Sequence, residues 1–248
     1  MAFRSSARTS RAVDEDNPYW ISFSDIMSGL LVIFILASLQ LILELSEKNE
    51  MIDDAIKELA ERNQARAEML EEISAELSSQ GIDVEIAENK SVLRIPDDQL
   101  YFKTLRYDIP KDRSHAVLSV GRALYNAITK DDRGRLIETV FIEGHTDSRP
   151  ARTLEMGNWG LSSYRAITVW NYWRGNNEYG AAMGGLKNRD NNPMFSISGY
   201  SATRPKIKND NTAEKQRQNR RIDIRITMRQ PNLIDLKNIK KILGENDA

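Results

Sequence analysis

The sequence predicts an α+β protein in which a single transmembrane helix and a helical stalk precede an α/β sandwich domain. Residues 20–43 are almost continuously apolar, residues 44–80 combine a heptad pattern with an acidic excess, and residues 81–230 alternate between strand-like and helix-like patterns. We therefore divide the chain into an N-terminal tail (1–19), a span (20–43), a coiled-coil-like stalk (44–80), a sandwich domain (81–230) and a C-terminal helix or tail (231–248).

Composition excludes several classes of site. The chain has 248 residues, no cysteine and two histidines. A disulfide framework, a thiolate metal site and a cysteine nucleophile are therefore excluded, and a zinc centre would have few ligands. The net charge is −1 over residues 1–43, −7 over residues 44–79 and +7 over the remainder. This division indicates three different environments on one chain, and we expect no metal and no cofactor.

The apolar run is long enough to cross a bilayer. It has 24 residues, of which 17 are apolar, against a hydrocarbon core of roughly 30 Å. Tyr19 and Trp20 suit the membrane interface at its start. A cleaved signal peptide is the less favoured alternative, because the run is long and no small-residue cleavage site follows it. Basic residues flank the run equally on both sides, so charge does not fix its orientation.

One carboxylate lies inside this span. Asp25 is the only charged residue between Asp16 and Glu44. A charge in mid-membrane costs roughly 2.5–3.5 kcal/mol on insertion scales. Asp25 is therefore either an ion carrier or a structural polar residue that bonds to a neighbouring helix. We expect this span to contact membrane lipid. A lone span cannot form an ion pathway, so the carrier hypothesis also requires partner helices.

The stretch YWISFSDIMSGLL (residues 19–31) resembles the single span of flagellar stator B subunits, the MotB family. The family's tryptophan aligns better with Tyr19 than with Trp20. The resemblance implies that Asp25 translocates a proton or a sodium ion and that the partner is a membrane ring built from several A-type (MotA-like) proteins. It also implies a bacterial inner-membrane protein with a cytoplasmic N-terminus and a periplasmic C-terminal domain.

The stalk carries a heptad repeat. Apolar residues fill most of its two core series: Leu45, Ile52, Leu59 and Ile73 in one, and Ile56, Leu70 and Leu77 in the other, which also holds Asn49 and Asn63. Asparagine at such a position fixes register in two-stranded coils. We expect a continuous helix, paired with its copy in a homodimer and ended near Gly81. The alternative is an amphipathic helix packed on its own domain.

The basic domain mixes strands and helices. Residues 84–87 and 92–95 predict a hairpin, and residues 138–143, 195–200 and 222–228 predict further strands. Helices are expected over 113–129 and 158–173, a loop over 181–193, and a closing helix over 233–242. Asn158 is a candidate cap for the second of these helices. This order indicates a sheet with helices on one face.

Several motifs occur in a fixed order: Glu143–Ser148 (EGHTDS), Asn158–Ala166 (NWGLSSYRA), Gly199-Tyr200, Pro205 and Asn219-Arg220-Arg221. Together they resemble the OmpA-like peptidoglycan-binding domain over roughly residues 84–230. The resemblance implies that Asp147 and Arg165 hold the diaminopimelate of the stem peptide, and that Thr146, Asn158, Leu161 and Arg221 complete the pocket. A carboxylate beside a forked guanidinium suits such a zwitterion. For the Arg220-Arg221 pair, a solvated surface pair or a salt bridge to the sheet remains open, and His145 is expected to orient neighbours by hydrogen bonding.

These features predict the B subunit of an ion-driven, stator-like motor anchored to peptidoglycan. The short stalk and total length resemble the B subunit of Zorya anti-phage defence more than flagellar stators. The alternatives are a passive cell-wall anchor and the B subunit of a flagellar stator. We do not expect an enzyme, because His145, Asp147 and Ser162 occur without a Gly-x-Ser-x-Gly elbow or a metal-ligand cluster. Nor do we expect nucleic-acid binding, since the basic residues lack interleaved aromatics.

Overall fold

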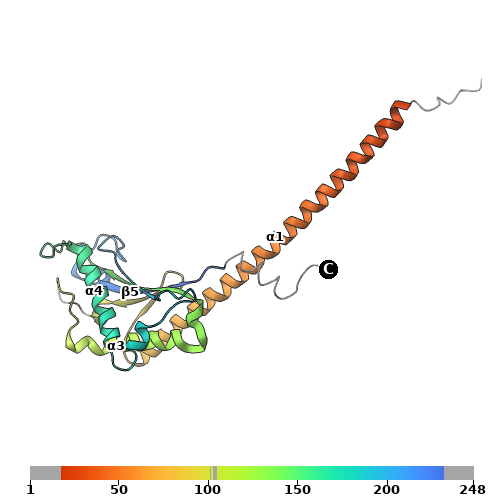
Figure 1. Cartoon of the computed structure of the whole chain (residues 1–248). Coiled ribbons are helices and arrows are strands. Elements are labelled where there is room, and N and C mark those ends of the chain that lie inside the picture. Colours follow the sequence, from red (N-terminus) through yellow and green to blue (C-terminus); the bar gives the residue numbers. More distant parts are fainter. Residues whose placement is uncertain (1–17, 101, 103–104, 232–248) are drawn as a thin grey trace, which may run out of the picture. The chain divides into compact units, whose positions relative to one another are not determined.

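The computed structural model describes residues 18–100, 102 and 105–231 (Figure 1). The chain divides into two units, residues 1–55 with 233–248 and residues 56–232, and each is taken by itself. Most of the expected N-terminal tail and the expected C-terminal helix lie outside the described residues.

The first unit contains most of the apolar helix. Helix α1 runs from Pro18 to Ser79 and ends where the sequence predicts, two residues before Gly81. Among the described residues it is the one helix long and apolar enough, by length and composition, to cross a membrane. Its large apolar side chains from Tyr19 to Leu45 are exposed, as a helix surrounded by lipid requires.

The last turns of α1 belong to the core of the second unit. Leu70, Ile73 and Leu77 are fully buried in that core. Glu72 accepts hydrogen bonds from Arg133 (Nη1 2.9 Å) and from Lys130 (Nζ 3.1 Å), which lower the pKa of Glu72 to about 2. For these heptad positions the structure therefore shows the alternative arrangement, a helix packed on its own domain. The boundary between the units falls at residue 56 and not at the predicted end of the stalk.

A five-stranded sheet forms the centre of the second unit. Its strands are β1 (Glu85–Ala87), β2 (Val92–Pro96), β3 (Ile137–His145), β4 (Phe195–Gly199) and β5 (Arg221–Met228), in the order β1-β2-β5-β3-β4. Only β3 and β4 are parallel. The helices after α1 are α2 (Asp97–Leu100), α3 (Ser114–Thr129), α4 (Gly157–Arg174), α5 (Gly180–Gly184) and α6 (Ala213–Asn219), with 3-10 segments at Lys111–Arg113 and Lys130–Leu136. The α+β class and the α/β sandwich are confirmed.

Most predicted elements occur within one or two residues of their expected ends. The hairpin turn between β1 and β2 uses Glu88, Asn89 and Lys90, all three in the left-handed region. The expected loop over 181–193 includes most of the short helix α5. Helices α2 and α6 were not predicted, because they have four and seven residues and too little periodicity to detect.

The two faces of the sheet differ in polarity. Ile222, Ile224 and Ile226 of β5 point into the core that α3 and α4 cover. The alternate residues of the sheet form a buried charged row on the opposite face, where Asp223 pairs in register with Arg94 of β2 and Glu143 of β3. This alternation fixes which β5 side chains can reach a given site.

Candidate functional site

Two glycines bring the sequence motifs together. Gly144 of β3 and Gly199 of β4 are neighbours in the parallel pair. A Cβ on Gly144 would lie 2.0 Å from the carbonyl oxygen of Ser162, and one on Gly199 would lie 2.2 Å from Oγ of Ser163. Because both positions lack a side chain, α4 packs directly against the ends of these strands. Residues just after β3 therefore lie beside the first turns of α4.

Asp147 is a buried carboxylate held by two arginines. It is 5% exposed. Oδ1 accepts from the backbone N and Nε of Arg149, each at 3.1 Å. Oδ2 accepts from Nη2 of Arg149 at 2.7 Å and from Nη1 of Arg220 at 2.9 Å. Burial raises the pKa of Asp147, but the hydrogen bonds from Arg149 and Arg220 outweigh it and hold the pKa below its usual value. Asp147 is therefore ionised at neutral pH.

Arg220, and not Arg221, reaches this site. Arg220 donates through Nε and Nη2 to Oδ2 of Asp97, at 3.0 and 2.7 Å, in addition to its bond to Asp147. Arg221 begins β5 and lies on the charged face of the sheet, where its Nε is 3.0 Å from Oδ2 of Asp223. The salt bridge to the sheet, one of the two alternatives left open for this pair, is what the structure shows for Arg221. Arg220 lines the cavity described below, and Arg221 is not among its lining residues.

Arg165 is a buried cation on the opposite side of the site. It is 2% exposed, its Nε donates to the carbonyl of Arg106 at 3.0 Å, and its guanidinium carbon lies 4.9 Å from the ring centroid of Phe102. Burial lowers the pKa of Arg165 to about 10, so it remains charged at neutral pH. The backbone bond and the aromatic ring fix the direction of the guanidinium.

The other predicted residues have different tasks. Asn158 does not cap α4, because that helix begins at Gly157 and Met156 is its cap position. Asn158 instead fixes the preceding loop: its Oδ1 accepts from the backbone of Ala151 at 3.0 Å, and its Nδ2 donates to the carbonyl of Arg149 at 3.0 Å. Thr146 is buried, and its Oγ1 has no hydrogen-bond partner among the described residues. A ligand that bonds this hydroxyl would remove an unsatisfied polar group.

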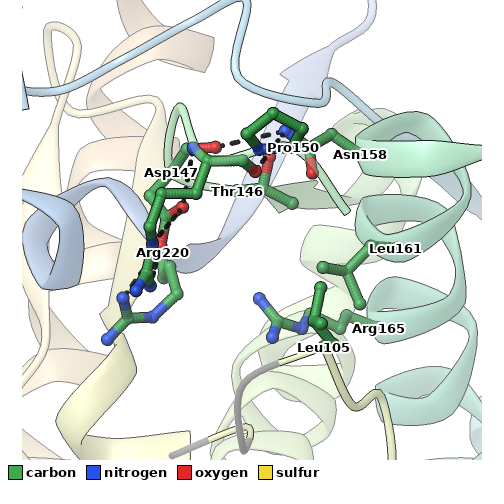
Figure 2. A pocket seen from close by; sticks show the side chains of 9 residues that line it. Leu105, Thr146, Asp147, Pro150, Asn158, Leu161, Arg165 and Arg220 are labelled. Atoms are coloured by element: carbon green, nitrogen blue, oxygen red, sulfur yellow. Dashed lines mark hydrogen bonds and ion pairs between the residues drawn. The ribbon is translucent and has the colours of Figure 1, made fainter. Parts of the chain in front are cut away.

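These side chains line one cavity of about 200 Å³ (Figure 2). Arg220 and Arg165 lie on opposite sides of it, with Asp147 and Thr146 along another edge. The lining consists of Leu105, Thr146, Asp147, Arg149, Pro150, Asn158, Leu161, Arg165 and Arg220. Five of the six predicted pocket residues are brought together. Arg149, Arg220, Pro150 and Leu105 were not predicted.

Arg220 is positioned by a network behind the cavity. Asn219 is 1% exposed and donates through Nδ2 to the carbonyl of Ile207 and to Oδ2 of Asp210, at 2.9 and 3.0 Å. The same Asp210 oxygen accepts from the backbone of Ser148 at 3.0 Å. The segment before β5 is therefore linked to the loop that carries Asp147.

His145 lies outside the cavity. Its ring stacks on Tyr200 with centroids 5.3 Å apart, and neither ring nitrogen has a hydrogen-bond partner among the described residues. The expected orienting hydrogen bond is therefore not seen. Burial, and next the charge of Arg221, lower the pKa of His145 to about 3, so the imidazole is neutral at physiological pH.

Three buried groups, Glu143, His145 and Asp223, lie close enough to hold a metal ion. Arg225 donates to both oxygens of Glu143, at 2.8 and 3.1 Å. Arg94 donates to both oxygens of Asp223, at 3.1 and 3.3 Å. Because guanidinium groups already neutralise both carboxylates, this cluster is an ion-pair network rather than a metal centre.

Asp25 belongs to the first unit. It lies within the apolar part of α1, and its side chain is exposed. The nearby hydroxyl of Ser28 donates a hydrogen bond to the carbonyl of Ser24 at 2.7 Å. This hydroxyl therefore has its hydrogen-bond partner within the helix.

Comparison with known proteins agrees with this geometry. The OmpA family model matches residues 101–220, which include the whole cavity lining. Over these residues the chain is similar to the OmpA family. Comparison with curated proteins gave no match.

The chain is also similar to several solved structures. A MotB-like protein from Desulfovibrio vulgaris is 19% identical, with 68% of this chain and 98% of that chain covered and a TM-score of 0.50. The cell wall anchor of the T6SS from Pseudomonas aeruginosa is 26% identical, with coverages of 65% and 97% and a TM-score of 0.45. The periplasmic domain of Helicobacter pylori MotB is 21% identical, with coverages of 66% and 92% and a TM-score of 0.42. The first of these shows a shared fold.

Proposed function

We propose that the OmpA-family domain anchors the chain to peptidoglycan by binding the diaminopimelate of a stem peptide in the cavity between β3 and α4. The observation that carries the proposal is one cavity that holds an ionised carboxylate, Asp147, and three arginines, Arg149, Arg165 and Arg220. The free end of diaminopimelate carries an ammonium and a carboxylate. Asp147 matches the first group, and the forked guanidinium of Arg165 matches the second.

The rest of the cavity supports the same ligand. Leu105, Pro150 and Leu161 provide apolar lining for the methylene chain that joins the two ends of diaminopimelate.

Sedimentation of the protein with purified peptidoglycan sacculi tests this anchor. Arg165→Lys keeps the charge but loses the fork, and we expect it to weaken binding about tenfold or more. Asp147→Asn should do the same without changing side-chain volume. Arg174→Ala is the matched control, because this exposed arginine lies at the other end of the same helix. Retention of full sacculus binding by both pocket variants would refute the anchor.

The proposal also gives the span a function. A single-pass inner-membrane helix with a cytoplasmic N-terminus would place the OmpA-family domain in the periplasm, where peptidoglycan is found. Asp25 would take up a proton or a sodium ion and release it inward. About 2.3 kcal/mol per charge per 100 mV is then available to drive rotation. A lone span forms no pathway, so the chain would act as a homodimer inside an A-type ring.

Among ion-driven systems we favour a role in Zorya anti-phage defence, with a flagellar stator as the alternative. The resemblance of the span and the short connection to the OmpA-family domain support this choice. Neighbouring genes distinguish the two: defence nucleases with a long-tailed A-type partner indicate defence, and flagellar genes indicate motility. A passive cell-wall anchor is the second candidate function, in which Asp25 is only structural.

Substitution of Asp25 separates a motor from an anchor. In cells that carry the intact operon, we expect Asp25→Asn to raise phage plating to the level of unprotected cells, because an amide cannot carry the ion. Asp25→Glu should retain part of the protection. Ser28→Ala, which changes a nearby polar residue on the same helix, should behave as wild type. Full protection by Asp25→Asn would leave only the passive anchor.

A further inference from the structure

The carboxylate of Asp147 is already neutralised by its own chain. All side-chain hydrogen bonds that Arg149 makes among the described residues go to Asp147, from Nε to Oδ1 at 3.1 Å and from Nη2 to Oδ2 at 2.7 Å. Together they form a forked pair that uses both carboxylate oxygens. An ammonium that is to bind Asp147 therefore meets a group that is already paired.

The two arginines that bind Asp147 differ in their number of acidic partners and in their exposure. Arg220 also donates twice to Asp97, and its side chain is 18% exposed. Arg149 has Asp147 as its acidic partner, and its side chain is 49% exposed. Because the guanidinium of Arg149 is half exposed, water and salt screen its attraction to Asp147 more than they screen that of Arg220. Arg149 is thus the guanidinium that can leave, and Arg220 is the one that stays.

We propose that Arg149 occupies the ammonium subsite and that the ligand's ammonium displaces it. The inference rests on the proposed function and deepens it, because binding at Asp147 becomes an exchange of one cation for another. Arg149 keeps a buried carboxylate compensated in the absence of a better cation. Arg149 therefore competes with the ligand, because an incoming ammonium must first break the forked pair between Arg149 and Asp147. A ligand without an ammonium leaves the pair in place.

This exchange gives a defined expectation for affinity. Removal of Arg149 should strengthen binding of an ammonium-bearing ligand by about two- to fivefold, the range that an exposed ion pair allows. The same change should not strengthen binding of a ligand that lacks the ammonium, because that ligand never competes with Arg149. A direct contact between Arg149 and the ligand carboxylate predicts the opposite sign.

Calorimetric titration of the full chain in detergent micelles tests the proposal with two synthetic probes. One is a stem tetrapeptide that contains diaminopimelate, and the other is the same peptide with 2-aminopimelate, which lacks the free ammonium. The variants are Arg149→Ala and Arg149→Gln, the second of which keeps most of the side-chain length. Arg152→Ala is the matched control, because it removes an exposed arginine from the same loop.

We expect both Arg149 variants to bind the diaminopimelate peptide two- to fivefold more tightly and the 2-aminopimelate peptide no more tightly than wild type does. Arg152→Ala should bind both probes as wild type does. Weaker or unchanged binding of the diaminopimelate peptide, or equal tightening on both probes, overturns the exchange while leaving the anchor intact. Failure of wild type and variants alike to bind the first probe overturns the anchor as well.

Discussion

At the scale of single residues, His145 makes folding depend on pH. Its pKa is about 3 in the folded chain and about 6.5 when exposed, because burial disfavours the charged ring. As the pH falls below about 6.5, the unfolded chain binds a proton that the folded chain does not bind. The free energy of unfolding should therefore decrease by up to about 1.4 kcal/mol per pH unit toward pH 3.

Urea unfolding between pH 6.5 and 4.5 measures this effect. His145→Phe keeps a ring beside Tyr200, and His145→Gln keeps a polar side chain. In both variants the free energy of unfolding should depend less steeply on pH than in wild type, by about the contribution of one titrating group. Protonation of acidic groups with lowered pKa values, such as Glu72 and Asp147, destabilises the fold mainly below this pH range. These groups are present in wild type and in both variants, so they do not affect the comparison. An unchanged slope in both variants would show that His145 is protonated in the folded protein.

Some of the residues that line the cavity could be predicted from the sequence, and others could not. Asp147 and Arg165 were predictable because their motifs have fixed spacing. Arg221 does not line the cavity because β5 alternates: Ile222, Ile224 and Ile226 are in the core, so Arg221 faces the charged row with Asp223. The same alternation, applied to the sequence, would have favoured Arg220. No sequence signal marks Arg149 as the partner of Asp147, since the loop between β3 and α4 determines that contact.

At the scale of elements, close approach of α4 to the sheet organises the site. Gly144→Ala would place a methyl group 2.0 Å from the carbonyl oxygen of Ser162. We expect a loss of about 1–3 kcal/mol in the free energy of unfolding, together with weaker sacculus binding, because α4 carries Leu161 and Arg165. Gly185→Ala is the control, since its nearest contacts would be ordinary at 3.5 Å. Equal effects of the two substitutions on stability and binding would contradict this role for Gly144.

The long elements were predictable and the stalk was only partly so. Clear periodicity identified α3 and the hairpin. A heptad repeat and the face of a packed amphipathic helix differ by only 3.5 against 3.6 residues per turn. Leu70, Ile73 and Leu77 therefore satisfy both patterns, and tertiary packing decides in favour of the domain core. Leu45, Ile52 and Ile56 remain exposed and are apolar heptad positions available to the proposed homodimer.

At the scale of the whole molecule, charge and hydropathy divide the chain into three segments, whereas the fold has two units that meet at residue 56. The alternation of strand-like and helix-like patterns over residues 81–230 predicted the α/β sandwich. The position of the boundary at residue 56 depends on which residues of α1 the domain core buries, and this could not be read from local composition. The proposed motor needs both units on one chain, because an ion carrier performs work only if the chain is held against the wall.

The most direct test of the account is the affinity of the full chain for stem tetrapeptides that contain either diaminopimelate or lysine. The lysine peptide keeps the ammonium for Asp147 but lacks the carboxylate for Arg165. We predict that the diaminopimelate peptide binds about tenfold or more tightly than the lysine peptide, and that Arg165→Lys removes most of this difference. Equal affinity of the wild-type chain for both peptides would contradict the account.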